Sequence, residues 1–156
     1  MDQRRAKARG TSVQRAAQRL PSPGEQGPAR LILVADDYDA AAEMLADVIS
    51  LDGHAALVAL DGREALQLAL ANEIDAAILD LDMPLANGNV VAEQIRRARP
   101  GCCPLLIALT GGDNLGETAG EGLFDLLLTK PIARGDLHGV YGILNRRSRP
   151  PTCDVG

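Results

Sequence analysis

The sequence predicts an α/β domain: a doubly wound parallel sheet of five strands, covered by five helices in three layers. Short apolar runs alternate along the chain with segments in which apolar residues recur at helical spacing. The runs lack polar alternation, which is typical of parallel strands covered on both faces. Hydrophobic residues make up 46% and charged residues 24% of the chain, as in soluble globular domains.

The five apolar runs have the length and composition of buried strands. A buried helix could give a similar short run, but the length of the runs and their spacing between helical segments favour strands. Their order also predicts that the carboxyl ends of the strands meet at one edge of the sheet. The runs comprise residues 31–35, 55–60, 76–81, 105–110 and 124–129.

The residues between the first two runs predict a helix that ends at Gly53. Its apolar residues fall on one helical face, which we expect to pack against the sheet. These residues are Ala41, Met44, Leu45, Val48 and Ile49. A second helix is predicted after the next run, because Asp61 and Glu64 resemble a capping box.

Two further helices follow the third and fifth runs. Asn87 and Gly88 turn the chain into a helix that stops before Pro100. The last helix has an apolar stripe formed by Leu137, Val140, Tyr141 and Leu144. The repeat pattern requires one more helix between the fourth and fifth runs, although residues 111–122 are rich in glycine and form helices poorly.

Charge divides the chain into unequal parts. Residues 1–30 contain seven basic and two acidic side chains and are expected to form a flexible basic arm, although their composition also resembles a transit peptide. Residues 31–146 are expected to form the folded domain, and residues 147–156 a short tail. The domain is strongly acidic and should repel nucleic acid, although the arm alone could bind phosphates weakly.

No apolar run approaches the ~18 residues needed to cross a bilayer. The positive charges near the N-terminus are not followed by an apolar stretch, so they do not indicate a secretory signal. We therefore expect a cytoplasmic protein without a membrane segment. Because only about ten residues follow the last helix, we also expect no DNA-binding domain.

Polar residues stand at the strand ends, where doubly wound sheets bind their ligands. Asp36 and Asp37 follow the first strand, Asp80 lies at the end of the third, Thr110 ends the fourth and Lys130 follows the fifth. Carboxylates at such an edge repel each other unless a cation neutralises them. Mg²⁺ is suited to this position because it prefers oxygen ligands and bridges phosphate groups.

These residue types predict a phosphoryl-transfer site. The transition state spreads charge over three equatorial oxygens, and Mg²⁺, Lys130 and the hydroxyl of Thr110 could each stabilise one of them. Asp80 would then be the nucleophile. Taken singly, an acidic pair is most often a helix cap and a Lys-Pro pair a turn, so the prediction depends on their joint order.

At these positions the sequence resembles the receiver domains of two-component response regulators. The matching segments are ILVADD (32–37), ILDLDMPLANG (78–88), LIALTGG (106–112) and LLTKPI (127–132). The resemblance covers roughly residues 30–146 and implies a flavodoxin-like fold. It also implies a signalling protein that accepts and then loses a phosphoryl group, not a dedicated enzyme.

Carried over residue by residue, the resemblance implies that Asp80 is phosphorylated by a sensor histidine kinase or a histidine phosphotransfer protein. Asp37, Asp80 and the backbone carbonyl of Asp82 would ligate Mg²⁺ directly, and Asp36 would act through water. Thr110 and Lys130 would hold phosphoryl oxygens. A downstream protein target is implied, and a homodimer is possible.

The switch position departs from the family. Three residues before the conserved lysine the family usually has an aromatic residue or histidine, which works together with the threonine, whereas this chain has Leu127. We expect Leu127 to stay in the apolar layer. Thr110 could still bind a phosphoryl oxygen, so the response would have to involve the glycine-rich residues 111–122.

Two alternatives remain open from the sequence. Asp80-x-Asp82 after an apolar strand also resembles the nucleophile motif of haloacid-dehalogenase-type phosphotransferases and phosphatases, although in that family the motif comes first in the chain. Leu127 leaves room for a receiver-fold interaction module that is not phosphorylated. A nucleotide-binding enzyme is disfavoured, because no glycine-rich loop ends in Gly-Lys-Ser/Thr.

Overall fold

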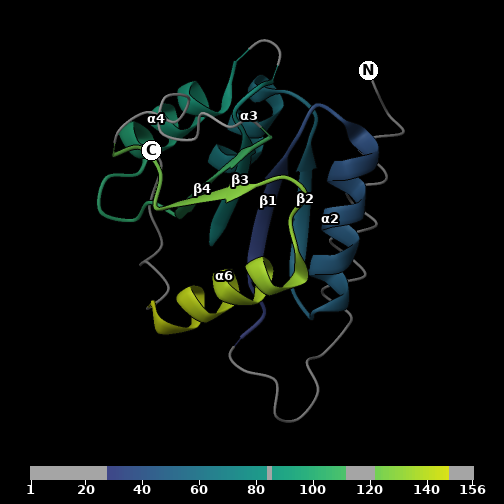
Figure 1. The fold of residues 1–156 in the computed structure, drawn as a ribbon. Coiled ribbons are helices and arrows are strands. Elements are labelled where there is room, and N and C mark those ends of the chain that lie inside the picture. The colour runs from purple at the N-terminus through teal and green to yellow at the C-terminus, as the bar shows by residue number, and fades with distance from the viewer. Residues whose placement is uncertain (1–27, 84–85, 112–121, 148–156) are drawn as a thin grey trace.

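The computed structural model describes residues 28–83, 86–111 and 122–147, which form one parallel sheet with helices on both faces (Figure 1). The strands lie in the order β2-β1-β3-β4-β5. They are β1 (Leu31–Ala35), β2 (Ala55–Ala59), β3 (Ala76–Asp80), β4 (Leu105–Thr110) and β5 (Leu126–Thr129). The described helices are α2 (Asp39–Leu51), α3 (Gly62–Ala71), α4 (Gly88–Ala98) and α6 (Arg134–Arg146).

This strand order is the flavodoxin-like order, so the predicted fold class is confirmed. Four of the five predicted helices lie in the described part of the chain. The remaining one was expected on a segment whose residues 112–121 lie outside that part, as do residues 1–27 of the basic arm and the tail from residue 148. None of the described helices has the length and apolar character required to cross a bilayer.

Alternating residues of the strands face two separate helix layers. Ile32 and Val34 of β1 belong to the apolar cluster that contains Ile49 of α2 and Leu137 of α6. Leu33, between them in the sequence, belongs to the other cluster, which is completed by α3 and α4. Figure 1 shows the same division, with α2 and α6 on one side of the sheet and α3 and α4 on the other.

The inner strands are buried on both faces, as the absence of polar alternation predicted. Every residue of β3 and of β4 is buried. The strand β5 differs, because it lies at the edge of the sheet and its residues are alternately half-buried and exposed. The expectation that Leu127 stays in the apolar layer is therefore wrong: its side chain is 46% exposed.

The helix starts agree with the sequence-based predictions. The Asp61 side chain accepts a hydrogen bond from the backbone N–H of Glu64 at 2.8 Å, which satisfies one of the free donors of the first turn of α3. Asn87 caps α4 in the same way, accepting from Val90 N–H at 3.1 Å. The four residues predicted as the inner stripe of α6 are all buried.

The helix α2 uses the predicted face only in part, since Ile49 is buried and Leu45 and Val48 pack against the core as predicted. Its buried residues are Ala42, Ala46 and Ile49, whereas Met44 is 68% exposed. The sequence of α2 contains enough small and apolar residues to form two adjacent stripes, and only one of them contacts the sheet. The second stripe remains on the surface.

Buried polar residues fix the amino-terminal edge of the sheet. Asp75 accepts a hydrogen bond from Leu31 N–H at 2.8 Å and forms an ion pair with Arg30 at 3.5 Å. The Arg30 guanidinium also donates to the Leu144 carbonyl at 2.8 Å, and the Arg30 backbone N–H donates to His54 Nδ1 at 3.0 Å. These bonds join the start of β1 to β3, to α6 and to the end of α2.

Candidate functional site

The carboxyl ends of β1 and β3 bring three carboxylates together. The chain leaves β1 toward β2 on one side, while β3 lies on the other side, so β1 and β3 flank the topological switch point. Asp36 and Asp37 follow β1, and Asp80 is the last residue of β3. One carboxylate oxygen from each of these three residues lies within 4.8 Å of the others.

Asp80 is held at the bottom of this cluster. Its side chain is 3% exposed, its Oδ1 accepts from the Asp82 backbone N–H at 3.0 Å, and its Oδ2 accepts from Lys130 Nζ at 2.9 Å. Burial raises the pKa of the Asp80 carboxyl; the hydrogen bonds from Lys130 and Asp82 offset part of this, and the charge of Asp36 adds to it. The carboxylate is oriented by two donors at a position where its charge is poorly solvated.

The two acidic residues after β1 have different surroundings. Asp36 is buried, and its Oδ1 accepts a hydrogen bond from the Tyr38 backbone N–H at 3.0 Å. Its Oδ2 lies 3.2 Å from Lys130 Nζ. Asp37 is exposed. The strand order alone did not distinguish these two neighbours, and the structure places Asp36 against the lysine and Asp37 at the solvent side.

Lys130 is brought to the cluster by the strand β5. Its backbone N–H donates to the Thr110 carbonyl at 2.8 Å, which extends the parallel pairing of β4 and β5 by one residue. Partial burial would lower the pKa of Lys130, but the hydrogen bond to Asp80 and the charges of Asp80 and Asp36 raise it on balance. The ammonium group therefore stays protonated.

The remaining predicted site residues also lie near this edge of the sheet. Thr110 is the last residue of β4 and is 2% exposed, and in the strand pairing its neighbour Leu109 lies opposite Asp80. Leu127 lies on β5 opposite Ala108, three residues before the lysine, with its side chain directed toward the surface. Asp82 is exposed, and its backbone N–H faces Asp80.

The sequence did not reveal why α4 begins with a glycine, Gly88. A Cβ atom at this position would lie 2.7 Å from the carbonyl oxygen of Asp80, closer than side chains approach backbone atoms. Gly88 therefore allows the first turn of α4 to pack on the backbone of Asp80. This packing helps to fix the backbone that carries the Asp80 carboxylate. Because it is a contact in space, the sequence pattern did not show it.

The donor set of the cluster fits a hard divalent cation. The cluster holds three carboxylates, and among the described residues the ammonium group of Lys130 contacts Asp36 and Asp80, so the three carboxylates outnumber this cation. Carboxylates at such short separations repel each other until a cation binds between them. Their oxygen atoms and the partly open position of Asp37 suit Mg²⁺, which keeps several waters and takes one or two protein carboxylates.

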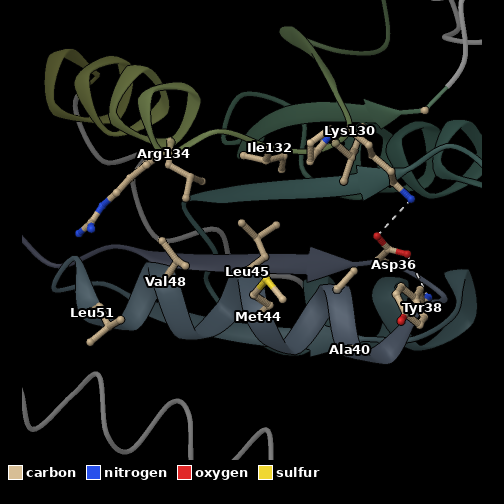
Figure 2. Close-up of a pocket in the computed structure, with 15 residues that line it drawn as sticks. Asp36, Tyr38, Ala40, Met44, Leu45, Val48, Leu51, Lys130, Ile132 and Arg134 are labelled. Carbon is tan, nitrogen blue, oxygen red and sulfur yellow. Dashed lines mark hydrogen bonds and ion pairs between the residues drawn. The ribbon is translucent and has the colours of Figure 1, made fainter.

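A groove opens beside the cluster. It has a volume of about 650 Å³ and runs between α2 and the segment that follows β5. Figure 2 shows the Asp36–Lys130 ion pair at one end of the groove and Arg134 toward the other. Between them, Leu45 and Val48 of α2 point toward the segment that carries Ile132.

Sequence comparison identifies relatives of the whole described domain. Residues 32–141 match the model of the response regulator receiver domain. A response regulator receiver protein of Anaeromyxobacter sp. (strain Fw109-5) is 36% identical over 105 residues, covering 67% of this chain and 44% of that protein. Response regulator MprA of Mycolicibacterium vanbaalenii is 38% identical over 121 residues, covering 76% of this chain and 52% of that protein.

The chain therefore spans about half the length of the curated relatives it matches. The family match also decides between the receiver family and the haloacid-dehalogenase family, because these relatives are response regulators.

Solved structures that superpose on this chain include response regulator receivers. The receiver domain of Methylobacillus flagellatus superposes with a TM-score of 0.68 at 30% identity, covering 75% of this chain and 99% of that one. The response regulator TrrA of Thermotoga maritima, determined in complex with Mg²⁺ and BeF, superposes with a TM-score of 0.67 at 27% identity. That superposition covers 74% of this chain and 98% of TrrA.

Proposed function

The chain belongs to the response regulator receiver family, and from this premise we propose that it accepts a phosphoryl group on Asp80 and thereby switches a protein-binding surface. The donor would be a sensor histidine kinase or a histidine phosphotransfer protein, and the recipient of the signal a downstream protein. The chain would act in the cytoplasm as a signalling module that loses its phosphoryl group by hydrolysis.

The observation that carries the proposal is the sharing of one ammonium group by two buried carboxylates. Lys130 Nζ lies 2.9 Å from Asp80 and 3.2 Å from Asp36. A purely structural ion pair needs one cation for each carboxylate, whereas a phosphoacceptor needs spare negative charge to hold a metal ion and a cation that can turn to the incoming phosphate. This cluster supplies both.

In the proposed reaction a carboxylate oxygen of Asp80 attacks the phosphorus of a phosphohistidine. A P–O bond forms as the P–N bond breaks, and the leaving electron pair remains on the imidazole nitrogen, which takes a proton from water. The product is an acyl phosphate. Lys130 would hold one phosphoryl oxygen and the Thr110 hydroxyl another, each through a charge-assisted hydrogen bond.

The metal ligands are proposed residue by residue. Asp37, Asp80 and the backbone carbonyl of Asp82 would bind Mg²⁺ directly, and Asp36, which already contacts Lys130, would act through water. When bound, Mg²⁺ neutralises the carboxylates and the charge of the incoming phosphoryl oxygens. The Mg²⁺ and BeF complex reported for TrrA supports the choice of Mg²⁺ as the metal ion.

The proposed switch follows from the exposed position of Leu127. Thr110 can respond to a phosphoryl group, but Leu127 has no aromatic ring to move and is already 46% exposed. We therefore expect phosphorylation to change the mobility of residues 111–122 more than the side-chain rotamer of Leu127. Hydrogen exchange with and without beryllofluoride would test this; unchanged exchange in 111–122 together with a Leu127 rotamer change would reject it.

The experiment that tests the function is phosphoryl uptake from a small acyl phosphate in the presence of Mg²⁺. Intact mass should increase by one phosphoryl group in the wild type and in Asp82→Asn, which alters a carboxylate in the same loop but keeps the backbone. Asp80→Ala should show no increase. Equal uptake by Asp80→Ala and the wild type would reject Asp80 as the acceptor.

A further inference from the structure

The strand β5 has a sequence that does not define its own register. It begins with three consecutive leucines, residues 126–128, so a slip of one residue along β4 would still place leucine at two of the three positions that leucine now occupies. Its residues are half-buried or exposed, and in the described sheet it pairs with β4 alone. The apolar pattern of β5 is therefore too weak to hold the strand in the observed register.

The register matters because it sets the reach of Lys130. The Lys130 backbone N–H donates to the Thr110 carbonyl at 2.8 Å, and its Nζ lies 2.9 Å from Asp80 and 3.2 Å from Asp36. A slip of one residue displaces the strand by ~3.3 Å and turns each side chain to the other face. Both ion pairs of Lys130 would then be lost.

A polar anchor fixes the start of the strand. Asp125, the residue before β5, donates its backbone N–H to the Leu106 carbonyl at 2.8 Å, and its Oδ2 accepts from the Leu106 N–H at 2.9 Å. Leu106 precedes Ile107, which is the β4 partner of Leu126. A slipped strand would break both bonds and deprive the buried Leu106 N–H of its acceptor, which is costly.

Arg96 of α4 holds this anchor from the side. Its Nε donates to the Leu123 carbonyl at 2.8 Å, and its Nη2 lies 3.6 Å from Asp125 Oδ2. Its Nη1 donates to Cys103 Sγ, just before β4, at 3.8 Å. The side chains of Arg96 and Asp125 are both partly buried, which limits screening by salt. One guanidinium therefore joins the segment before β5 to the segment before β4.

The helix α4 thus contacts both halves of the ion pair between Asp80 and Lys130. At its start, Gly88 packs so closely on the Asp80 carbonyl oxygen that a Cβ would lie 2.7 Å from it. Arg96 lies eight residues later, ~12 Å along the helix axis, and holds the start of the strand that leads to Lys130. Because one helix makes both contacts, it fixes the place of Lys130 relative to Asp80.

We propose that Arg96 is a positioning residue for Lys130, which acts through Asp125 and the Leu123 carbonyl to fix the register of β5. Without Arg96, the strand takes a slipped register in part of the molecules, and Lys130 no longer reaches the carboxylate cluster in them. The inference does not depend on phosphoryl transfer. Phosphoryl uptake tests the proposed function, whereas strand register and metal affinity test the role of Arg96.

NMR on the full chain reads the register directly. Cross-strand NOEs should join backbone protons in the observed pairs, Ala108 with Leu127 and Leu109 with Leu128. Arg96→Met should weaken these NOEs and add a second set that is shifted by one residue. If Arg96→Met does not fold, Arg96→Lys carries the same test, because a single ammonium group replaces the two donors that hold Leu123 and Asp125.

Arg99→Met is the matched control. Arg99 directly follows α4, and its Nη2 donates to the Ala69 and Asn72 carbonyls at the end of α3, at 3.0 and 2.9 Å. The variant removes the same charge and should lower the free energy of unfolding, but it should keep a single set of NOEs. A second set as strong as that of the Arg96 variant would overturn the proposal, because the slip would then reflect general loosening.

Mg²⁺ affinity provides a second readout, which a merely structural role would not improve. Lys130 repels a cation at the cluster, so Lys130→Met should tighten Mg²⁺ binding roughly three- to tenfold. Arg96→Met should tighten it by about two- to fivefold, since Lys130 is displaced in only part of the molecules. In the Lys130→Met background, Arg96→Met should change the affinity by less than about 1.5-fold.

Titration calorimetry measures the four affinities of this cycle. An unchanged register in the Arg96 variant would overturn the proposal. So would an effect of Arg96→Met on Mg²⁺ affinity that is undiminished in the Lys130→Met background, because Arg96 would then act without Lys130.

Discussion

The strand β3 has a buried carboxylate at each end, and the two differ in how their charge is balanced. Asp75, directly before the strand, is 4% exposed and pairs with the buried guanidinium of Arg30. It also accepts a backbone hydrogen bond from Leu31 at 2.8 Å. At this edge of the sheet, the buried carboxylate of Asp75 has a positive partner of its own.

At the other end, Asp80 is 2% exposed and shares the ammonium group of Lys130 with Asp36. The carboxylate of Asp37 lies in the same cluster. Burial alone therefore does not mark a functional carboxylate in this protein. The two ends differ in charge balance, because Asp75 has its own guanidinium partner, whereas Asp80 and Asp36 share one ammonium group.

The largest expected effect is on stability at the balanced end. Arg30→Met leaves Asp75 buried without its cation and should lower the free energy of unfolding by roughly 3–5 kcal/mol. Arg97→Met is the matched control, because Arg97 pairs with Glu93 and both side chains are exposed, and it should cost less than about 1 kcal/mol. Urea unfolding measures both; equal costs would remove the distinction between a buried and an exposed pair.

Mg²⁺ should stabilise the folded protein through the unbalanced end. At a tenfold excess over its dissociation constant, Mg²⁺ should raise the free energy of unfolding by about 1.4 kcal/mol. Asp37→Asn should nearly abolish the effect and Asp36→Asn should only weaken it. Thermal unfolding with and without Mg²⁺ gives the comparison, and identical losses in the two variants would contradict the proposed ligand ranking.

Without Mg²⁺, removing one negative charge from the carboxylate cluster should increase the free energy of unfolding. Burial raises the pKa of Asp80 in the folded state, so its ionised form opposes folding at neutral pH. Asp80→Asn should therefore be more stable than the wild type at pH 7, by on the order of 1 kcal/mol. The wild type should regain stability relative to Asp80→Asn as the pH falls from the raised pKa of Asp80 toward the ordinary value of 3.8, because its folded state then binds the proton first.

Unfolding in EDTA between pH 7 and pH 4 checks this sign. Two results would show that Lys130 fully compensates the Asp80 charge. One is a wild type with a higher free energy of unfolding than Asp80→Asn at pH 7. The other is a wild type whose free energy of unfolding falls relative to that of Asp80→Asn on acidification.

The smallest effect is expected at the edge strand. Leu127→Ala removes a side chain that is 46% exposed and should cost less than about 1 kcal/mol. Ile107→Ala, in the fully buried strand β4, should cost roughly 2–5 kcal/mol. Guanidinium unfolding measures both variants. A cost at Leu127 close to that at Ile107 would indicate that the side chain is buried in solution.

The order of the elements was predictable because parallel buried strands and amphipathic helices have different apolar periods. The bounds predicted for the first and fourth strands coincide with β1 and β4. Packing faces were less predictable. The apolar periodicity of α2 is compatible with either of two adjacent stripes, so it did not show that Met44 faces outward. The exposure of Leu127 follows from the position of β5 at the edge of the sheet, which the sequence of that strand alone does not show.

The members of the site were predictable for a topological reason, since the carboxyl ends of parallel strands meet at one edge. Asp36, Asp37 and Asp80 were therefore expected to lie together, and one carboxylate oxygen of each lies within 4.8 Å of the others. Strand order does not show that Asp36 contacts Lys130 while Asp37 faces solvent, nor that Gly88 packs on the Asp80 backbone. These depend on side-chain directions and close contacts that strand order does not determine.

The most direct test of the central claim locates the phosphoryl group among the carboxylates of β3 and the adjoining loop. The protein is phosphorylated with a small acyl phosphate and Mg²⁺, reduced with borohydride to convert the acyl phosphate to homoserine, digested and sequenced by mass spectrometry. We predict homoserine at position 80 and none at positions 75 or 82. Homoserine at position 75 or 82, or none anywhere in a protein that has gained phosphoryl mass, would contradict it.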